Sequence, residues 1–331
     1  MQTLRRAGIA LLAAALPCAC ALAQSAGSYP GKPVHVIVPY PAGGVVDGLM
    51  RNIGQQVSES VGQAVIVDNR PGANTIIALE TCAKAAPDGY TLCTSSSDGM
   101  SFNPHLYRKL PYDADRDFAP VTQLVWVNGV IVAGAKVPYE SVKEMVAFAK
   151  QKPGTVNFAS FGMGSTPHFF VEWFNKSGEV GIVHVPYKGS AQIIPALLSG
   201  EADATFIAMG IVLPQIRSGR MKALAVTGPR RSPYLPEIST LAEQGLDPQL
   251  QNWFGVFAPA RSPKPVVDRL NAEFVRALRQ PRFEEQFLKV QAFDAVGNSP
   301  AEFAEFLKAD RANAKQVIAR TGIRLEDASP R

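Results

Sequence analysis

The chain has 331 residues, of which 47% are hydrophobic and 18% are charged, so it is long enough for two domains with separate cores and too apolar for a disordered protein. Its 33 Lys and Arg residues outnumber its 28 Asp and Glu residues, but the basic residues are scattered singly or in pairs. Because nucleic-acid binding needs basic residues gathered on one face, this composition argues against a nucleic-acid partner.

Residues 1–23 have the three parts of a secretory signal peptide. Arg5 and Arg6 form the charged region, Ala7–Leu16 is the apolar region, and Ala21–Ala23 is an A-x-A cleavage site. The apolar region is too short to span a bilayer, which needs about 20 residues, and no later segment reaches that length without charge, Gly or Pro. We therefore predict export to the periplasm, with cleavage near Ala23.

The four cysteines leave two questions open. Cys18 and Cys20 lie near the cleavage site, so lipoprotein processing is an alternative to ordinary cleavage, although Pro17 makes a poor recognition sequence for it. Only Cys82 and Cys93 would remain in the mature chain, which is too few for a disulfide-rich scaffold. The two could form one bridge, but we favour two small buried thiols.

Strands and helices alternate in the first third of the chain. The β-branched run Val34–Val38 leads through a loop rich in Pro and Gly into a helix, whose apolar residues recur at positions 49, 53, 57 and 61. A strand at 64–67, a helix at 76–86 and a strand at 90–94 follow. This alternation predicts an α/β fold built on a parallel sheet.

Three capping boxes predict where further helices begin. Each pairs a hydroxyl residue with a Glu three positions later: Ser141 with Glu144, Thr240 with Glu243, and Ser299 with Glu302. Gly245 would end the second helix, and Pro300 would be the first residue of the third. These are structural signals without chemical content.

Three loops before predicted helices are candidates for binding. Residues 38–44 and 185–189 share the pattern Val-Pro-Tyr followed by Gly, and residues 158–166 are rich in Gly, Ser and Thr, with Pro167 next. Backbone N–H groups at the start of a helix have no intrahelical partner, and they attract anions. If two halves of the molecule present these loops to one cleft, that cleft suits a carboxylate.

Catalytic and metal-binding motifs are missing from the sequence. We find no nucleophile elbow, Walker A loop, H-E-x-x-H or EF-hand loop. The histidines, His35, His105, His168 and His184, are far apart in the chain. We therefore predict a protein that is not an enzyme and has no cofactor or metal, while a Ser/His/Asp set assembled by folding stays an alternative.

At its loops the sequence resembles the tripartite tricarboxylate transporter receptors, also called Bug receptors. The resemblance covers nearly the whole mature chain and rests on many short motifs in one order. They include Tyr29–Pro33, Val38–Gly44 with Asp47, Asn69–Ala73, Ala85–Leu92, Asn103–Pro104, Leu110–Asp113, Asp117–Pro120, Asn157–Ser160, His184–Gly189, Leu213–Ile216, Ala223–Thr227, Trp253–Gly255 and Pro263–Pro265.

The resemblance implies a two-lobed periplasmic binding protein of the type II-like class, each lobe a sheet flanked by helices. Lobe one would hold residues 24–127 and 250–331, and lobe two residues 128–249, with the ligand between them. The ligand-binding residues implied in lobe one are Tyr40, Ala42, Gly43, Gly44 and Asp47. Those implied in lobe two are Phe161, Gly162, Gly164, Ser165, Thr166, His168, Tyr187, Lys188, Gly189, Ile207 and Ala208.

Departures from the family pattern bear on the ligand. Val45 and Val46 stand where the family usually has a small or Pro residue and a Thr or Asn, and Asn74 begins a stretch where it commonly has Gly-Gly-Asn. Ile207 replaces a common Asp, which argues against an amine-bearing ligand because a buried ammonium needs a charged partner. Asp98 could compensate for this loss. We expect a less polar mono- or dicarboxylate, aromatic acids included.

The resemblance also implies a partner. A monomeric receptor would deliver its small organic acid to integral membrane transporter subunits. Delivery to the ectodomain of a sensor kinase is the alternative, and the sequence does not separate the two.

Overall fold

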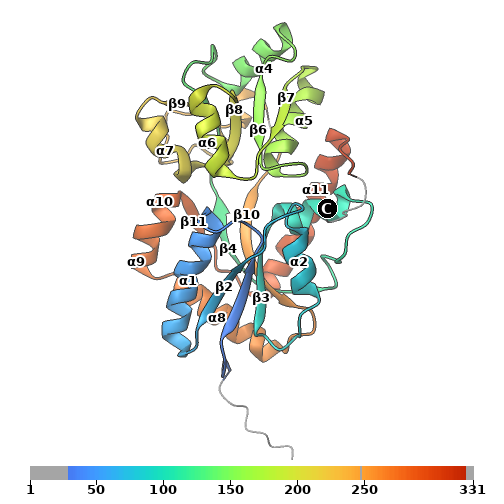
Figure 1. Ribbon diagram of the computed structural model, residues 1–331, viewed down its shortest axis with the longest axis vertical. Coiled ribbons are helices and arrows are strands. Elements are labelled where there is room, and N and C mark those ends of the chain that lie inside the picture. Colours follow the sequence, from blue (N-terminus) through green and yellow to red (C-terminus); the bar gives the residue numbers. More distant parts are fainter. Residues whose placement is uncertain (1–28, 247, 326–331) are drawn as a thin grey trace, which may run out of the picture.

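The computed structural model describes residues 29–246 and 248–325, which form two lobes stacked along the long axis of the molecule (Figure 1). The predicted signal peptide, with Cys18 and Cys20, lies outside the described residues. Within those residues no helix combines the length and the apolar character needed to cross a membrane.

The sheet of lobe one is mixed. Its strands lie in the order β11 (Phe293–Ala295), β4 (Phe118–Val127), β10 (Asn252–Pro259), β3 (Thr91–Ser96), β1 (Val34–Val38) and β2 (Val65–Asn69). β1 runs parallel to β2 and β3, as the alternation of strands and helices predicts. However, β10 is antiparallel to β3 and β4, so the prediction of a parallel sheet is wrong for this half of the sheet. β10 enters from the other lobe, which reverses its direction.

Lobe two repeats this plan with five strands. Their order is β7 (Val183–Pro186), β6 (Asn157–Ser160), β8 (Ala204–Ala208), β5 (Gly129–Gly134) and β9 (Met221–Val226). β6 is parallel to β7 and β8, whereas β5 is antiparallel to β8 and β9. In both lobes, therefore, the strand that enters from the other lobe is antiparallel to both of its neighbours, and in lobe one β11 is antiparallel to β4 as well.

The crossing strands show which edge of each sheet faces the other lobe. The chain leaves lobe one after Val127 and enters β5 at Gly129, and it returns into β10 at Asn252. The end of β3 pairs with the start of β10, and the end of β8 pairs with the start of β5. The carboxyl ends of the parallel strands of both lobes therefore point toward each other.

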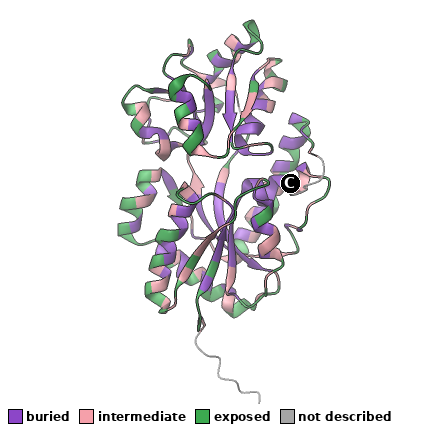
Figure 2. Ribbon diagram, viewed as in Figure 1, coloured by how far each residue is buried: buried purple, intermediate pink, exposed green. Residues whose placement is uncertain are grey.

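Helices flank both sheets, and the strands between them are largely buried (Figure 2). In chain order the helices are α1 (Val45–Val61), α2 (Ile76–Ala83), the π-helical turn η1 (Asp98–Phe102), α3 (Asn103–Leu106), α4 (Val142–Gln151), α5 (Thr166–Gly178), α6 (Ser190–Ser199), α7 (Met209–Arg217), the 3-10 turn η2 (Ala242–Gln244), α8 (Lys264–Leu278), α9 (Pro281–Phe283), the π-helical turn η3 (Glu284–Leu288), α10 (Lys289–Gln291) and α11 (Pro300–Thr321).

The capping boxes have different outcomes. Ser299 and Glu302 form a complete box at the start of α11, and the Ser141 side chain caps α4. Thr240 and Glu243 also exchange both hydrogen bonds, but only the short turn η2 follows before Gly245 adopts a left-handed conformation. The predicted start near Thr240 and the end at Gly245 are therefore confirmed, but the segment between them is a single 3-10 turn and not an α-helix.

Cys82 and Cys93 form a disulfide that links α2 to β3, with their Cα atoms 6.0 Å apart. Our preference for two free thiols is therefore wrong. Both residues are fully buried in the apolar core between α2 and the sheet, so the expected burial is correct. The spacing of 11 residues could not show that the two side chains face each other.

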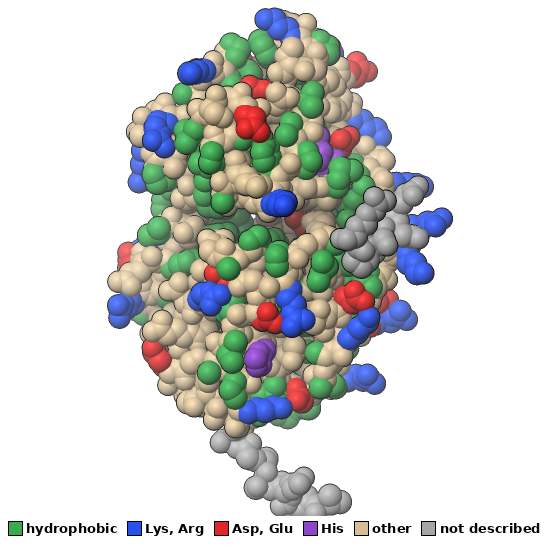
Figure 3. All heavy atoms as spheres, viewed as in Figure 1, with side chains coloured by type: hydrophobic (Ala, Val, Ile, Leu, Met, Phe, Trp, Pro, Cys, Tyr) green, Lys and Arg blue, Asp and Glu red, His purple; other side chains and the backbone are tan. Residues whose placement is uncertain are grey.

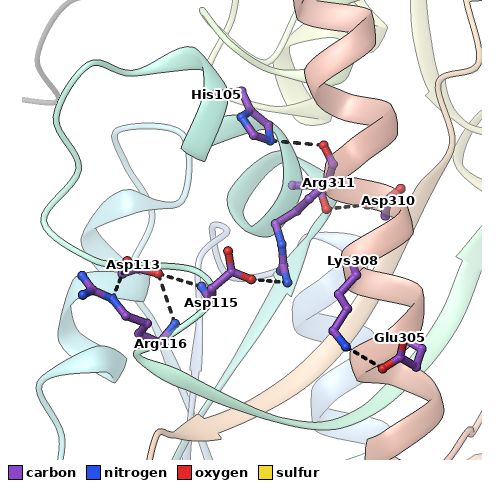
Figure 4. A network of polar contacts seen from close by, with 9 residues as sticks. His105, Asp113, Asp115, Arg116, Glu305, Lys308, Asp310 and Arg311 are labelled. Atoms are coloured by element: carbon purple, nitrogen blue, oxygen red, sulfur yellow. Dashed lines mark hydrogen bonds and ion pairs between the residues drawn. The ribbon is translucent and has the colours of Figure 1, made fainter.

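α11 belongs to both lobes. Phe303 and Leu307 lie in the core around the disulfide, whereas Val317 and Ile318 lie in the main core of lobe two. Polar contacts hold the middle of the helix to lobe one: His105 Nε2 lies 3.1 Å from the Arg311 carbonyl, and the Arg311 guanidinium pairs with Asp115 (Figure 4). The chain thus joins the lobes through the crossing strands and through this helix.

Candidate functional site

The surface is hollowed between the two lobes (Figure 3). The loops at the facing sheet edges lead into α1, α5, α6 and α7. The residues that precede these helices, Gly44, Ser165, Gly189 and Ala208, make no side-chain capping bond. The first N–H groups of a helix have no partner within the helix, so these loops present hydrogen-bond donors and positive dipole ends toward the space between the lobes.

Asp47 braces the loop between β1 and α1. Its carboxylate accepts a hydrogen bond from the Gly43 N–H at 2.9 Å and pairs with Arg51 at 3.0 Å. Burial acts to raise the pKa of Asp47, but the hydrogen bonds from Arg51 and Gly43 outweigh it and hold the pKa below its usual range. The structure places Asp47 beside Gly43 as a support of the loop, and its contact with a ligand stays a prediction.

The backbone conformation at position 43 favours glycine. Its φ of 77° lies in the left-handed region, and a Cβ there would meet no atom within 4 Å. Ala42 and Gly43 are exposed, and Gly44 is half-buried. This loop is therefore open on the side away from Asp47.

The loop between β7 and α6 is also open. Lys188 is exposed, and a Cβ on Gly189 would again meet nothing within 4 Å. The Lys188 N–H donates to the Gln192 side-chain oxygen at 2.9 Å. The N–H groups that no side chain caps are therefore those at the start of α6. The Tyr187 ring packs on the core of lobe two, and its hydroxyl donates to Glu201 beyond the end of α6.

The loop between β6 and α5 is closed by protein contacts. The Ser165 hydroxyl donates to the Gly162 carbonyl, and the His168 ring accepts from the Gly164 N–H through Nδ1 at 3.1 Å. The Thr166 hydroxyl donates to Asp98 of lobe one at 2.7 Å. Of the predicted residues in this loop, only Phe161 and Gly162 are not buried.

His168 lies over a second histidine. Its ring centroid is 4.3 Å from that of His184, and burial together with this neighbour lowers the pKa of His168 to about 4. His184 Nε2 lies 2.5 Å from the hydroxyl of Ser160, which is fully buried. Among the described residues no carboxylate is hydrogen-bonded to His184, so this Ser-His pair lacks the third group of a catalytic triad.

The remaining predicted residues pack inside the lobes. The Tyr40 hydroxyl donates to Ser96 at 2.9 Å, and its ring lies edge-on to Phe254. Ile207 is only 1% exposed and belongs to the core of lobe two, whereas Ala208 packs against the core of lobe one. Ile207 therefore fills the core, while Ala208 marks the place where β8 meets the other lobe.

Sequence reasoning missed a contact made by Asn74. Ala73, Asn74 and Thr75 all have left-handed φ angles, of 45°, 48° and 73°, although none of them is glycine. The backbone thus keeps a conformation that glycine favours, and Asn74 uses it to donate to the Gly164 carbonyl of lobe two at 2.9 Å. The sequence feature that could have indicated this contact is the Asn74-Thr75 pair, which replaces a glycine-rich run of the family pattern.

The polar groups of the site are backbone donors and carboxylates that are already bonded to protein groups. Its carboxylates, Asp47 and Asp98, already have protein partners, and its open loops offer backbone N–H groups. The described part of the chain holds no group of three or more His, Cys, Asp or Glu residues arranged to bind a metal ion. Backbone amides at helix N-termini bind carboxylates well.

Comparison with known proteins agrees with this geometry. Residues 49–323 match the family described as the tripartite tricarboxylate transporter family receptor. The chain belongs to this family. It is 34% identical over 304 residues to the protein BugT of Bordetella pertussis, covering 91% of this chain and 93% of BugT. The resemblance to Bug receptors is thereby confirmed.

Two solved structures of similar proteins contain dicarboxylates. Rpa4515 of R. palustris with adipate is 30% identical and superimposes with a TM-score of 0.82, covering 89% of this chain and 99% of Rpa4515. MatC of Rhodopseudomonas palustris with bound malate is 27% identical with a TM-score of 0.79, covering 88% and 100%. These neighbours confirm the two-lobed binding-protein fold for this receptor.

Proposed function

We propose that this receptor is a periplasmic solute-binding protein that captures a small carboxylated metabolite between its lobes and delivers it to a tripartite tricarboxylate-type membrane transporter. The observation that carries the proposal is the pair of open helix N-termini, α1 and α6, on opposite sides of the hollow between the lobes. A carboxylate there would accept hydrogen bonds from N–H groups that no side chain caps.

The ligand class follows from the polar groups available. The adipate and malate bound by the two similar proteins each carry two carboxylates. In this chain no acidic side chain of the site is free to hold an ammonium, and Ile207 is in the core. We propose a mono- or dicarboxylate without an amino group, bound by a monomer whose lobes meet at residues 127–128 and 249–250.

Binding can be tested directly. Protein unfolded in denaturant, dialysed and refolded to remove any carried-over ligand is titrated calorimetrically with adipate, malate, benzoate and aspartate. We expect heat of binding with at least one of the first three and none with aspartate. A folded preparation that binds no organic acid across a wider panel would refute the proposed function.

Delivery is tested separately, because a receptor for a sensor kinase would bind the same solute. Membrane vesicles that contain tripartite transporter subunits are assayed for uptake of the labelled acid with and without the receptor. Uptake that requires the receptor supports delivery to a transporter. Absence of uptake, together with ligand-dependent phosphorylation of a co-expressed sensor kinase, would favour the sensor role.

A further inference from the structure

Asp98 of lobe one lies against the N-terminus of a helix in lobe two. It is the first residue of η1, directly after β3, and only 8% of it is exposed. Its Oδ1 accepts a hydrogen bond of 2.7 Å from the hydroxyl of Thr166, and the Thr166 backbone N–H also acts to lower the pKa of its carboxyl group. Since Thr166 is the first residue of α5, Asp98 has the position that helix N-termini offer to anions.

The surrounding contacts hold Asp98 in this place. The Asn74 side chain donates to Gly164, and the Phe102 and Phe169 rings lie 4.6 Å apart across the same boundary between the lobes. η1 is held from the other side by α11, because Asp310 accepts from the Ser101 hydroxyl and from the Trp253 indole. The Asp98 carboxylate is therefore fixed by packing from both lobes.

Among the described residues no ion pair neutralises this carboxylate. The charged group that acts on Asp98 is Asp310, and Asp98 in turn raises the pKa of the neighbouring Tyr40 and Tyr107. Burial, followed by repulsion from Asp310, raises the pKa of Asp98 to about 6. The hydroxyl and the N–H at the start of α5 are thus its main compensation for the loss of water.

We propose that Asp98 determines specificity by acting as an internal carboxylate: it fills the N-terminus of α5 and excludes a carboxylate of the ligand from that helix. This proposal rests on the proposed function. A ligand carboxylate is then left with the uncapped N-termini of α1, α6 and α7. The part of the ligand that approaches α5 is therefore uncharged. Because Asp98 already occupies the N-terminus of α5, the receptor prefers an acid that has no carboxylate at that position.

The first experiment does not depend on the solute. Asp98→Ala removes the carboxylate and leaves an empty anion site, and formate is the probe. We expect 100 mM sodium formate to raise the Tm of Asp98→Ala by several degrees relative to 100 mM sodium chloride. The wild type and Asp98→Asn, whose side chains still occupy the site, should show a smaller rise, from formate bound at α1, α6 and α7 alone. Equal responses of Asp98→Ala and the wild type would overturn the proposal.

The second experiment measures selectivity between hexanoate and adipate, which have the same chain length and differ by one carboxylate. We expect Asp98→Ala to shift the ratio of their affinities toward adipate by about tenfold, and Asp98→Asn to shift it less. Asp88→Asn, at an exposed position of lobe one, serves as the matched control and should leave the ratio unchanged. An unchanged ratio in Asp98→Ala would contradict the role in specificity.

The two experiments separate two kinds of failure. If neither acid binds the wild type or any variant, the proposed function loses support, while the formate result still decides whether Asp98 fills an anion site. Thr166→Val provides a second variant should Asp98→Ala fail to fold. It removes the hydroxyl donor, keeps the carboxylate, and should show no larger response to formate than the wild type.

Discussion

The N-termini of α5 and α6 both belong to lobe two and both face lobe one, but they differ in what they hold. α5 receives a protein carboxylate from Asp98, and its loop is buried from Gly164 onward. α6 begins after Gly189, where an added Cβ would meet nothing, and no side chain caps it. The comparison shows that similar strand-loop-helix units can differ: one joins the lobes, and the other stays open, where we propose that a ligand carboxylate binds.

The largest expected effect concerns α2, whose preceding loop contacts the loop before α5. α2 carries Asn74 at its start and is tied to β3 by the Cys82–Cys93 disulfide. Replacing both cysteines with Ser removes a cross-link that closes a short loop, and we expect the free energy of unfolding to fall by about 3 kcal/mol. Urea denaturation measures this, with the reduced wild type as a control. An unchanged midpoint would mean that packing alone holds α2.

The second prediction concerns a variant that caps the N-terminus of α6. Gly189→Asp places a carboxylate at the N-terminus of α6, where there is room for it. It should cap the helix and repel the ligand carboxylate, so we expect organic-acid affinity to fall about 30-fold, equivalent to about 2 kcal/mol, with no loss of thermal stability. Gly189→Ala controls for the side chain and Gly189→Asn for capping without charge. Equal affinities of the Asp and Asn variants would argue against a carboxylate at α6.

The third prediction uses the pH dependence of the contact between Asp98 and Thr166. The folded protein holds a proton on Asp98 up to a pKa of about 6, above the value of about 3.9 in an unfolded chain. This contribution to stability is therefore complete below about pH 4 and is lost as the pH rises through 6. We expect the wild type to lose about 1 to 3 kcal/mol more than Asp98→Asn between pH 4 and pH 7.

Urea denaturation at several pH values checks this difference. Asp310 also has a pKa raised by burial, but it is present in both proteins, so its contribution cancels to first order. Parallel stability curves for the wild type and Asp98→Asn would show that the carboxylate of Asp98 does not titrate in this range.

The smallest expected effect concerns the support of the open loop after β1. Arg51→Ala removes the half-exposed partner of Asp47 and leaves the Gly43 hydrogen bond in place. We expect about a threefold loss of ligand affinity, because a partly exposed ion pair contributes less than about 1 kcal/mol. Arg116→Ala removes a similar pair, with Asp113, away from the facing edges and should leave the affinity unchanged. A larger loss would mean that Arg51 contacts the ligand.

Local patterns in the sequence predicted local structure well. The strand at Val34–Val38, the helix that follows it and the complete capping box at Ser299 are as expected, because neighbouring residues determine them. The antiparallel insertion of β10 was missed, since its partner β3 lies far away in the sequence. Pairing across such a distance leaves no trace in hydrophobic periodicity.

The sequence predicted which loops face each other, but not the hydrogen-bond partners of their side chains. The family resemblance correctly brought the loops after β1, β6 and β7 to facing edges. The sequence could not show that Thr166 would bond to Asp98, or that Asp47 would turn back to Gly43, since each contact depends on a side-chain direction set by the fold. Ile207 was chosen by its position relative to the family pattern, and its side chain fills the core.

The position of α11 after both crossings between the lobes has a consequence for the order of folding. The main core of lobe two contains Phe169 and Phe174 from α5, but also Val317 and Ile318 from the last helix. A chain made from its N-terminus completes residues 128–249 well before these two residues exist. Lobe two therefore keeps part of its apolar surface uncovered until α11 has packed against it.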